Sequence, residues 1–590
     1  RRELAALRLL GLFDRPATAD WVQALRKPPA IDGLTDPLVD LPDEDWEFTL
    51  TTLSDARLVS VNRDEATGEL ISLDAHPLIR EYFAMQLRRP DQAKRRSGND
   101  EPEDHADAGA SSLRSSIRPT ETSDVWRAAH RRLYEHLCET THEGDQPTLE
   151  DLQPLYQAIA HGCHAGLHEK AHDEIYVQRI RRGKRSYGTG KLGAFGSELG
   201  AITCFFASQW KTVAPSLEQY TPSLLSGAAF NLRALGRLME AREPMIAGVE
   251  DFVKRELWKF APGAASNLSE LELTLGEVSG ALSDAERSVT YADRSGDAHM
   301  RQETRCTNAD ALHQSGRRSE AESLFREAEQ MQVELQPAYP LLYSMQGRKY
   351  CDLLLAPAER EAWRAVLASR GREPSGDFLA ADKPNGSRPR LADQIEQCRG
   401  VTDRATQTLK WAEGKLGLLT IALDHLTLSR AALYESLLSG SAISPSASPL
   451  SAQCSEIEAA VSGLRRAGTT HHLPSGLLTR AWQRSLLGRK TGQDSAQSDL
   501  DEAWEIASRG PMPLFLADIH LYRARLFGVG PVPTGQPIDE TGRSEPALRE
   551  YPWESVEHDL AEARRLIVKH GYLRRMEELE DAERALLPHD

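Results

Sequence analysis

The sequence predicts a mostly helical chain in which a small winged-helix domain is followed by an all-α solenoid of helix pairs. Apolar residues recur at helical spacing along nearly the whole chain, and one short stretch near the start alternates with the period of strands. A glycine–alanine pattern also repeats every forty residues in the middle of the chain. With 590 residues, the chain is too long for a single hydrophobic core.

Residues 1–86 carry the pattern of a winged helix. Apolar residues at helical spacing mark three helices before residue 57. Two β-prone runs, 58–61 and 70–73, then flank a short polar turn, which is a hairpin signal. A further helix begins at Pro77, because proline is tolerated in the first turn of a helix. Three helices, a hairpin and a closing helix predict the winged-helix domain.

The rest of the chain divides into a linker and a repeat array. Residues 87–124 are charged and rich in Ser, Pro and Gly, so they bury too little apolar surface to offset the entropy of ordering, and we expect a flexible linker. From 125 to 590 the pattern is helical. Loop insertions are expected near 371–390, 439–451 and 529–552, where Pro, Gly and Ser accumulate.

The forty-residue repeat indicates tetratricopeptide-type helix pairs. In each copy a glycine ends one helix, and an alanine five residues later lets the second helix pack closely against the first. The three regular copies are Gly236 with Ala241, Gly276 with Ala281, and Gly316 with Ala321. Gly166 with Ala171 gives an earlier copy, and Gly196 with Ala201 keeps only the spacing.

The bulk composition excludes several classes of protein. The formal net charge of −17 disfavours broad binding of nucleic acid, because an acidic surface repels phosphate. No apolar run approaches the roughly 18 residues that span a bilayer. The seven cysteines are scattered without a C-x-x-C pair, which is typical of reduced thiols, so we expect a cytoplasmic protein.

Two segments imitate catalytic motifs. Residues 168–172 read H-E-x-x-H, the pattern of a zinc site on a helix. Ala171, however, falls at the helix-packing position of the repeat and no third ligand follows, so we interpret the match as part of the solenoid; adventitious metal binding by residues 161–172 stays an alternative. Gly190-Lys191 lies in a glycine-rich stretch, but Leu192 occupies the position where a P-loop needs Ser or Thr.

Neither segment predicts an active site, and the chain carries no other catalytic fingerprint. We therefore expect no enzymatic activity, no metal and no cofactor in this chain. The third helix of the winged helix would read DNA, yet residues 43–55 contain five acidic residues. A role in packing or gating is therefore favoured over DNA binding.

The inner face of the repeats is the predicted ligand site. Aligning the copies on their alanines places polar and charged side chains along the first helix of each pair, where the glycine and alanine positions already account for packing. Their mixture suits a protein or peptide ligand. The residues are Phe230, Arg233, Asn267, Glu270, Asp310 and His313. A merely solvated inner face is one alternative, and a sensor in the later repeats, around residues 471–482, is another.

Several stretches resemble a known family. LRALGRLMEAREPM, NLSELELTLGEVSGAL and DALHQSGRRSEAESLFREAEQMQ are similar to the C-terminal tetratricopeptide arrays of bacterial signal-transduction ATPases with numerous domains (STAND proteins) of the NACHT or NB-ARC type. In these ATPases a winged helix follows the nucleotide-binding core. The order of domains here is therefore similar as well, and the resemblance covers nearly the whole chain.

The resemblance implies a role for one histidine. In the family, a histidine near the end of the winged helix contacts the β-phosphate of bound ADP, and LDAHPLIREYF looks like that motif. The role falls to His76, although Pro77 replaces the usual aspartate. A histidine that merely begins a helix is the alternative.

The resemblance also implies a larger parent protein. The chain begins Arg1-Arg2-Glu3 without methionine, so we expect it to be a piece of a longer chain. The resemblance implies an upstream nucleotide-binding core that binds ADP or ATP, and an effector domain. The parent would sense a ligand through its repeats, oligomerise on activation and serve in anti-phage (antiviral) defence. A transcription regulator that joins a winged helix to repeats, and a generic repeat adaptor, remain the alternative functions.

Overall fold

The computed structural model describes residues 1–88, 124–183, 186–369, 391–440, 448–528 and 551–587. It divides into two compact units: unit 1 comprises Arg1–Lys184 with Ala214–Leu217, and unit 2 comprises Arg185–Val213 with Glu218–Asp590. Residues 89–123 of the predicted linker and most of the three predicted insertions lie outside the described residues, whereas residues 87, 88 and 124 belong to helices. None of the described helices is long and apolar enough to cross a membrane.

Unit 1 begins with the predicted winged helix. The β2–β3 hairpin turns at Asp64, whose side chain accepts hydrogen bonds from the backbone N–H groups of Ala66 and Thr67 at 2.9 and 2.8 Å. The three strands form one antiparallel sheet in the order β1-β3-β2, with Val61 opposite Leu73. The elements are α1 (Arg2–Leu10), β1 (Ala17–Thr18), α2 (Ala19–Arg26), α3 (Asp43–Asp55), β2 (Ser60–Arg63), β3 (Leu70–Asp74) and α4 (Pro77–Arg88).

The rest of unit 1 is helical. Thr148 caps α6, because its hydroxyl accepts from the backbone N–H of Asp151 while the Asp151 carboxylate accepts from the N–H of Thr148. Gly166 has a left-handed φ of 79°, and Ala171 is fully buried, as the early repeat copy predicts. The elements are α5 (Asp124–Thr140), α6 (Leu149–His164), α7 (His168–Lys170) and a π-helix, η2 (Ala171–Ile180).

Unit 2 opens with the early repeats, which match the forty-residue pattern. The three repeat glycines have φ between 75° and 85°, and the three repeat alanines are fully buried. The weaker copy is not a repeat turn, because Gly196 lies inside α9. The elements are α8 (Tyr187–Leu192), α9 (Phe195–Cys204), β4 (Phe206–Ser208), β5 (Thr212–Val213), η4 (Pro215–Tyr220), α10 (Thr221–Ala234), α11 (Leu238–Lys254), α12 (Ala261–Thr274), α13 (Val278–Ser295), α14 (Ala298–Gln314) and α15 (Arg318–Leu335).

The later helices of unit 2 differ more in length, from 26 residues to 11, and neighbours in sequence again pack against one another. Helix α19 begins at Ser448, before the end of the predicted insertion. The elements are α16 (Ser344–Ser369), α17 (Leu391–Ala412), α18 (Leu418–Leu438), α19 (Ser448–Ala467), η5 (Thr470–His472), α20 (Leu473–Leu486), α21 (Ala496–Arg509), α22 (Pro513–Phe527), α23 (Val556–His570), η6 (Leu573–Arg575) and α24 (Met576–Leu586). Consecutive helix pairs thus confirm the predicted α-solenoid.

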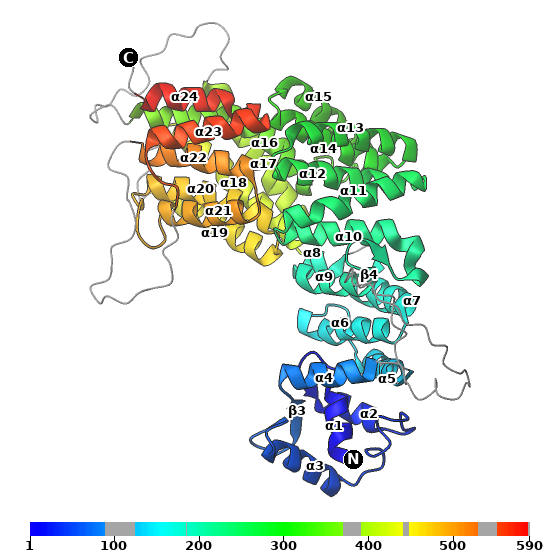
Figure 1. Ribbon diagram of the computed structural model, residues 1–590. Coiled ribbons are helices and arrows are strands. Elements are labelled where there is room, and N and C mark those ends of the chain that lie inside the picture. The colour runs from blue at the N-terminus through cyan, green and yellow to red at the C-terminus, as the bar shows by residue number, and fades with distance from the viewer. Residues whose placement is uncertain (89–123, 184–185, 370–390, 441–447, 529–550, 588–590) are drawn as a thin grey trace, which may run out of the picture. The chain divides into compact units, whose positions relative to one another are not determined.

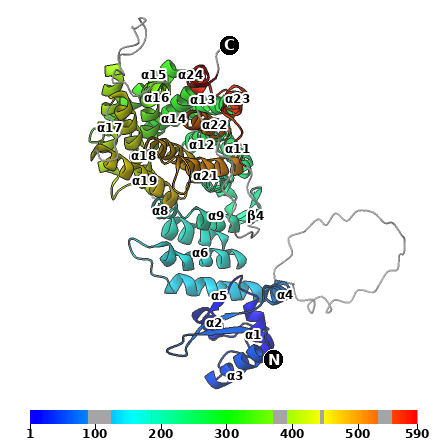
Figure 2. The ribbon, with the colours of Figure 1, turned by 90° about the vertical axis from the view of Figure 1, so that its left-hand side faces the viewer.

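The last helices of unit 2, from η5 to α24, fold back against α10 to α15. We call the first group the late helices and the second group the early repeats. Helix α22 contacts α12, η6 contacts α14, and η5 contacts α10, and both views in Figures 1 and 2 show α22 close to α12. Each repeat glycine lies at this junction: an added Cβ on Gly236 would lie 3.6 Å from Thr470, on Gly276 2.3 Å from Pro513, and on Gly316 3.0 Å from Leu573. We call this row of three contacts the glycine seam.

Candidate functional site

A cavity of about 230 Å³ lies in unit 2 between the early repeats and the late helices. The early repeats contribute residues of α10, α12 and α14, and α16 contributes a further group. The opposite wall comes from α18, the η5–α20 segment, α22 and η6. The inner face of the repeats is therefore covered by other helices of the same chain, and the cavity is the space that remains.

Three of the six predicted ligand-binding residues line this cavity, and three do not. Arg233, Glu270 and Asp310 are on its wall. Phe230 instead packs near Phe195, with ring centroids 6.0 Å apart. The other two lie next to the wall: the backbone carbonyl of Asn267 accepts a hydrogen bond from Arg233 at 3.2 Å, and the buried His313 places Nε2 3.8 Å from Asp352.

Arg233, Glu270 and Lys349 form a buried ion-pair chain on the cavity wall. Arg233 lies 2.9 Å from Glu270, and Lys349 donates to the other carboxylate oxygen of Glu270. Burial alone would raise the pKa of Glu270, but Lys349 and Arg233 lower it to about 2. Asp310, 4.0 Å from Lys349, has a raised pKa because burial outweighs that cation. Our sequence-based expectation that these side chains take no part in packing is therefore too simple.

A second carboxylate on the wall, that of Asp352, contacts three arginines. Asp352 accepts from Arg430 at 2.6 Å, forms an ion pair with Arg348 at 3.3 Å and contacts Arg574. Burial opposes ionisation of Asp352, yet Arg574, Arg430 and Arg348 hold its pKa well below the ordinary value. In contrast, burial lowers the pKa of Arg348, whose pairing with Asp352 does not offset its loss of hydration.

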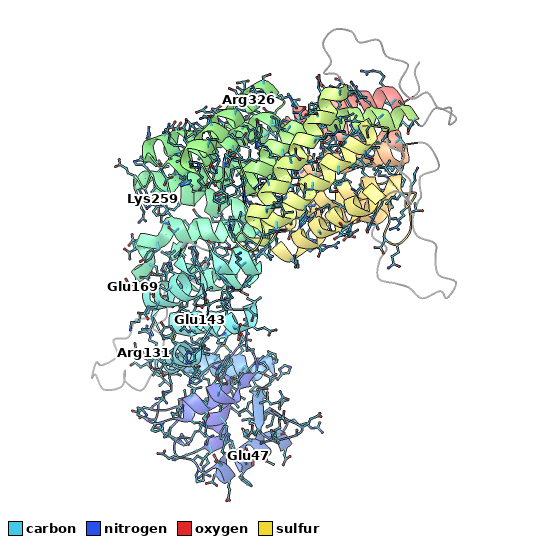
Figure 3. The ribbon with its side chains drawn as sticks, turned by 180° about the vertical axis from the view of Figure 1, so that it is seen from behind. Glu47, Arg131, Glu143, Glu169, Lys259 and Arg326 are labelled. Atoms are coloured by element: carbon cyan, nitrogen blue, oxygen red, sulfur yellow. The ribbon has the colours of Figure 1, made fainter. Side chains whose placement is uncertain are left out.

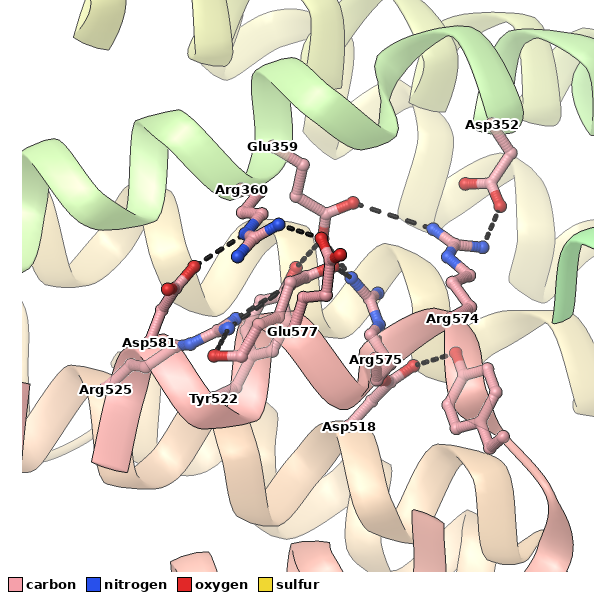
Figure 4. A network of polar contacts seen from close by, with 12 residues as sticks. Asp352, Glu359, Arg360, Asp518, Tyr522, Arg525, Arg574, Arg575, Glu577 and Asp581 are labelled. Atoms are coloured by element: carbon pink, nitrogen blue, oxygen red, sulfur yellow. Dashed lines mark hydrogen bonds and ion pairs between the residues drawn. The ribbon is translucent and has the colours of Figure 1, made fainter. Parts of the chain in front are cut away.

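Behind this wall, a network of arginines and carboxylates joins α16 to the late helices (Figure 4). Its centre is Glu359, which is fully buried and accepts from Arg430 at 3.0 Å, Arg575 at 3.1 Å and Tyr522 at 3.2 Å. Arg575 also reaches Asp518 at 2.9 Å. Such a network holds its helices in one arrangement, because removing any member leaves a buried charge without its partner.

The cavity wall has more cations than carboxylates. Its acidic side chains are Glu270, Asp310, Asp352 and Asp518. Its cationic side chains are Arg233, Arg348, Lys349, Arg430, Arg574 and Arg575. Burial raises the pKa of both Asp310 and Asp518. The wall is thus positive in a chain whose formal net charge is −17.

Three arginines of the wall have donors without acceptors. The buried Nε–H groups of Arg233, Arg348 and Arg574 find no hydrogen-bond partner among the described residues. A buried donor without an acceptor costs about 1–3 kcal/mol, so native proteins pair nearly all such groups. Apolar and aromatic side chains complete the wall: Leu273, Leu423, Leu478, Leu514, Phe515, Tyr522 and Tyr572.

The later part of the site was only partly foreseen from the sequence. The alternative sensor region, residues 471–482, contributes His471, His472, Ser475, Leu478 and Thr479 to the same cavity. The two predicted regions thus line one cavity. The other cations of the wall were missed: Arg348, Lys349, Arg430, Arg574 and Arg575. Arg574 and Arg575 lie in the short η6 segment between α23 and α24, which carries no repeat pattern.

The other positions that the sequence singled out lie elsewhere. His76 and the histidines of residues 161–172 belong to unit 1, and Gly190-Lys191 lies in α8. His76 is exposed, and its Nδ1 accepts from the backbone N–H of Leu78 at 3.3 Å, so it caps the first turn of α4. His172 pairs with Asp173 at 2.6 Å, and His161 lies 2.7 Å from His130 between their Nδ1 atoms. The described residues contain no group of three or more side chains placed to hold a metal ion.

No family model and no curated protein matches the sequence. Among solved structures, the chain is similar to a STAND protein with a tetratricopeptide repeat sensor from Pyrococcus horikoshii, with 11% sequence identity, a TM-score of 0.33 and 89% of this chain covered. The chain spans 59% of the length of that protein.

Proposed function

We propose that the chain is the ligand-sensing and autoregulatory region of a bacterial STAND signalling ATPase of the NACHT or NB-ARC type. The observation that carries the proposal is the cavity, which both the early repeats and the late helices line. A ligand that binds there contacts both parts at once. If the ligand binds one arrangement of the two parts more tightly than another, binding shifts the equilibrium toward the arrangement with the higher affinity.

The winged helix supports a junction with a nucleotide-binding core. Leu78, Tyr82 and Met85 are at least 47% exposed, and their spacing places them along one side of α4. His76 lies immediately before this helix. These exposed apolar side chains lie next to the candidate phosphate contact. They therefore suit a surface that packs on the upstream core and responds to the ADP bound there. The acidic start of α3 gives no comparable support to DNA binding.

The further parts of the proposal follow from the family resemblance. The parent protein would be cytoplasmic, would bind ADP or ATP through its upstream core and would oligomerise on activation in anti-phage defence. The repeats would recognise a protein, a peptide or a smaller ligand. A cavity of about 230 Å³ holds several water molecules, so it takes a small molecule or one or two side chains of a polypeptide.

Replacing His76 with alanine in the parent protein is expected to speed the release of ADP about tenfold or more. The imidazole would donate a charge-assisted hydrogen bond to a phosphate oxygen, a contact worth about 1.5–3 kcal/mol. Release of a fluorescent ADP analogue measures the rate. His142→Ala is the matched control, because His142 is also exposed in unit 1. A coding region without a nucleotide-binding core upstream of Arg1, or equal release rates for His76→Ala and His142→Ala, would contradict the proposal.

A further inference from the structure

We propose that the cavity of unit 2 binds a small molecule through an oxyanion group, a phosphate or a carboxylate, that Arg233, Arg348 and Arg574 hold. This inference deepens the proposed function, because it names the chemical class of the ligand. It rests on the geometry of the cavity wall and on the donors that the protein itself leaves unpaired.

The first support is the arrangement of donors. Arg233 comes from α10, Arg348 from α16 and Arg574 from η6, so three separate parts of the solenoid bring guanidinium groups to one cavity. The side chains of Arg233 and Arg574 are only 7% and 6% exposed, and all three have a buried Nε–H without an acceptor among the described residues. An oxyanion supplies several acceptor lone pairs at once and matches the fork of a guanidinium.

The second support is the balance of charge around the cavity. Its wall has two more cations than carboxylates, and two of those carboxylates have raised pKa values. Glu359 stands behind the wall and pairs with Arg430, Arg575 and, at 3.7 Å, Arg574, but it forms no ion pair with Arg233 or Arg348. A buried cation that lacks full compensation is costly, and a bound anion removes that cost.

The third support is the apolar part of the wall. Leucines from α12, α18, α20 and α22, together with Phe515, face the same space as the arginines. A cavity that combines apolar side chains with a few convergent polar groups is typical of small-molecule sites. We therefore expect a ligand that joins one oxyanion to an apolar or planar body, and not a free inorganic ion.

The test measures ligand binding to the isolated 590-residue chain by calorimetry at constant ionic strength. The probes are inorganic phosphate, AMP and benzoate, with adenosine as the uncharged counterpart of AMP. We expect AMP or benzoate to bind more tightly than inorganic phosphate, and adenosine to bind at least tenfold more weakly than AMP if AMP is the better probe. The comparison of AMP with benzoate distinguishes a phosphate ligand from a carboxylate ligand.

Variants then place the bound anion in the cavity. Arg348→Gln and Arg233→Gln are each expected to weaken binding about tenfold to a hundredfold, through loss of a charge-assisted contact. Both variants should fold, because Asp352 keeps Arg430 and Arg574, and Glu270 keeps Lys349. The matched control is Arg326→Gln, since Arg326 lies on α15 outside the cavity with 71% of its side chain exposed (Figure 3).

The inference is overturned if no anionic probe binds more tightly than about 1 mM, or if AMP is the better probe and adenosine binds as well as AMP. It is also overturned if Arg326→Gln weakens binding as much as Arg348→Gln, because a general effect of charge would then explain the loss. These results are independent of ADP release from the parent protein. A failure here therefore leaves the test of the proposed function standing, and the reverse also holds.

Discussion

Replacing Glu359 with glutamine is expected to lower the free energy of unfolding of unit 2 by about 3–5 kcal/mol, the usual cost of breaking a buried ion pair. Glu359 is fully buried and accepts from Arg430, Arg575 and Tyr522. Glutamine keeps the shape but removes the charge, so the buried guanidinium groups of Arg430, Arg575 and Arg574 lose a counter-ion. Urea unfolding, followed by tryptophan fluorescence, measures the change, because Trp363 and Trp482 stack nearby with ring centroids 3.6 Å apart.

The matched control is Glu361→Gln on the same helix. Glu361 pairs with Arg364 near the surface, and Arg364 keeps Asp581 as a second partner, so the expected cost is about 0–1 kcal/mol. An effect of Glu359→Gln no larger than that of Glu361→Gln would show that the network does not hold unit 2 together.

The same network predicts a dependence on pH. Although burial alone would raise the pKa of Glu359, Arg575 and Arg430 lower it below the ordinary value of 4.5. A carboxylate with a lowered pKa in the folded state stabilises the protein above the unfolded pKa, and this stabilisation is lost as the pH falls below about 4.5. Unit 2 of the wild type should therefore lose stability more steeply below that pH than unit 2 of Glu359→Gln.

Replacing Gly276 with alanine is expected to destabilise unit 2 by about 2–5 kcal/mol, because two costs add. The left-handed φ of 75° costs an L residue about 1–2 kcal/mol, and overpacking costs about 1–3 kcal/mol more. The overpacking arises because the new Cβ would lie 2.3 Å from Pro513 and 2.7 Å from His570. Hydrogen exchange should therefore quicken in α12 and α23, on the two sides of the glycine seam.

Gly296→Ala separates these two costs. Gly296 also has a left-handed φ, of 68°, but nothing lies within 4 Å of an added Cβ. It should therefore show only the backbone penalty and no change in hydrogen exchange at the seam. Equal destabilisation by the two variants would mean that the late helices do not pack against the early repeats at Gly276.

The winged helix and the helix pairs could be predicted from the sequence because their signals are local. Each repeat glycine ends a helix, and each repeat alanine follows after five residues, so one short segment specifies the turn and the packing of its pair. The same register placed Arg233, Glu270 and Asp310 on the inner face, where the structure has them on the cavity wall.

The return of the late helices could not be predicted in the same way. The hydrogen bond from His570 to the carbonyl of Gly276 joins residues 294 positions apart, and no local pattern specifies such a contact. The register also loosens after α15, where helices of unequal length replace the forty-residue repeat. For the same reason, sequence analysis predicted the repeat glycines only as turn residues. It did not predict that Arg574 lies on the cavity wall.

An experimental structure of the chain bound to its tightest anionic probe tests the central claim most directly. The claim is that the early repeats and the late helices together form one anion-binding site. We expect the oxyanion of the probe to lie within hydrogen-bond distance of Arg233, Arg348 and Arg574. A probe bound elsewhere on the chain, with the pairing of these three arginines unchanged, would contradict the account.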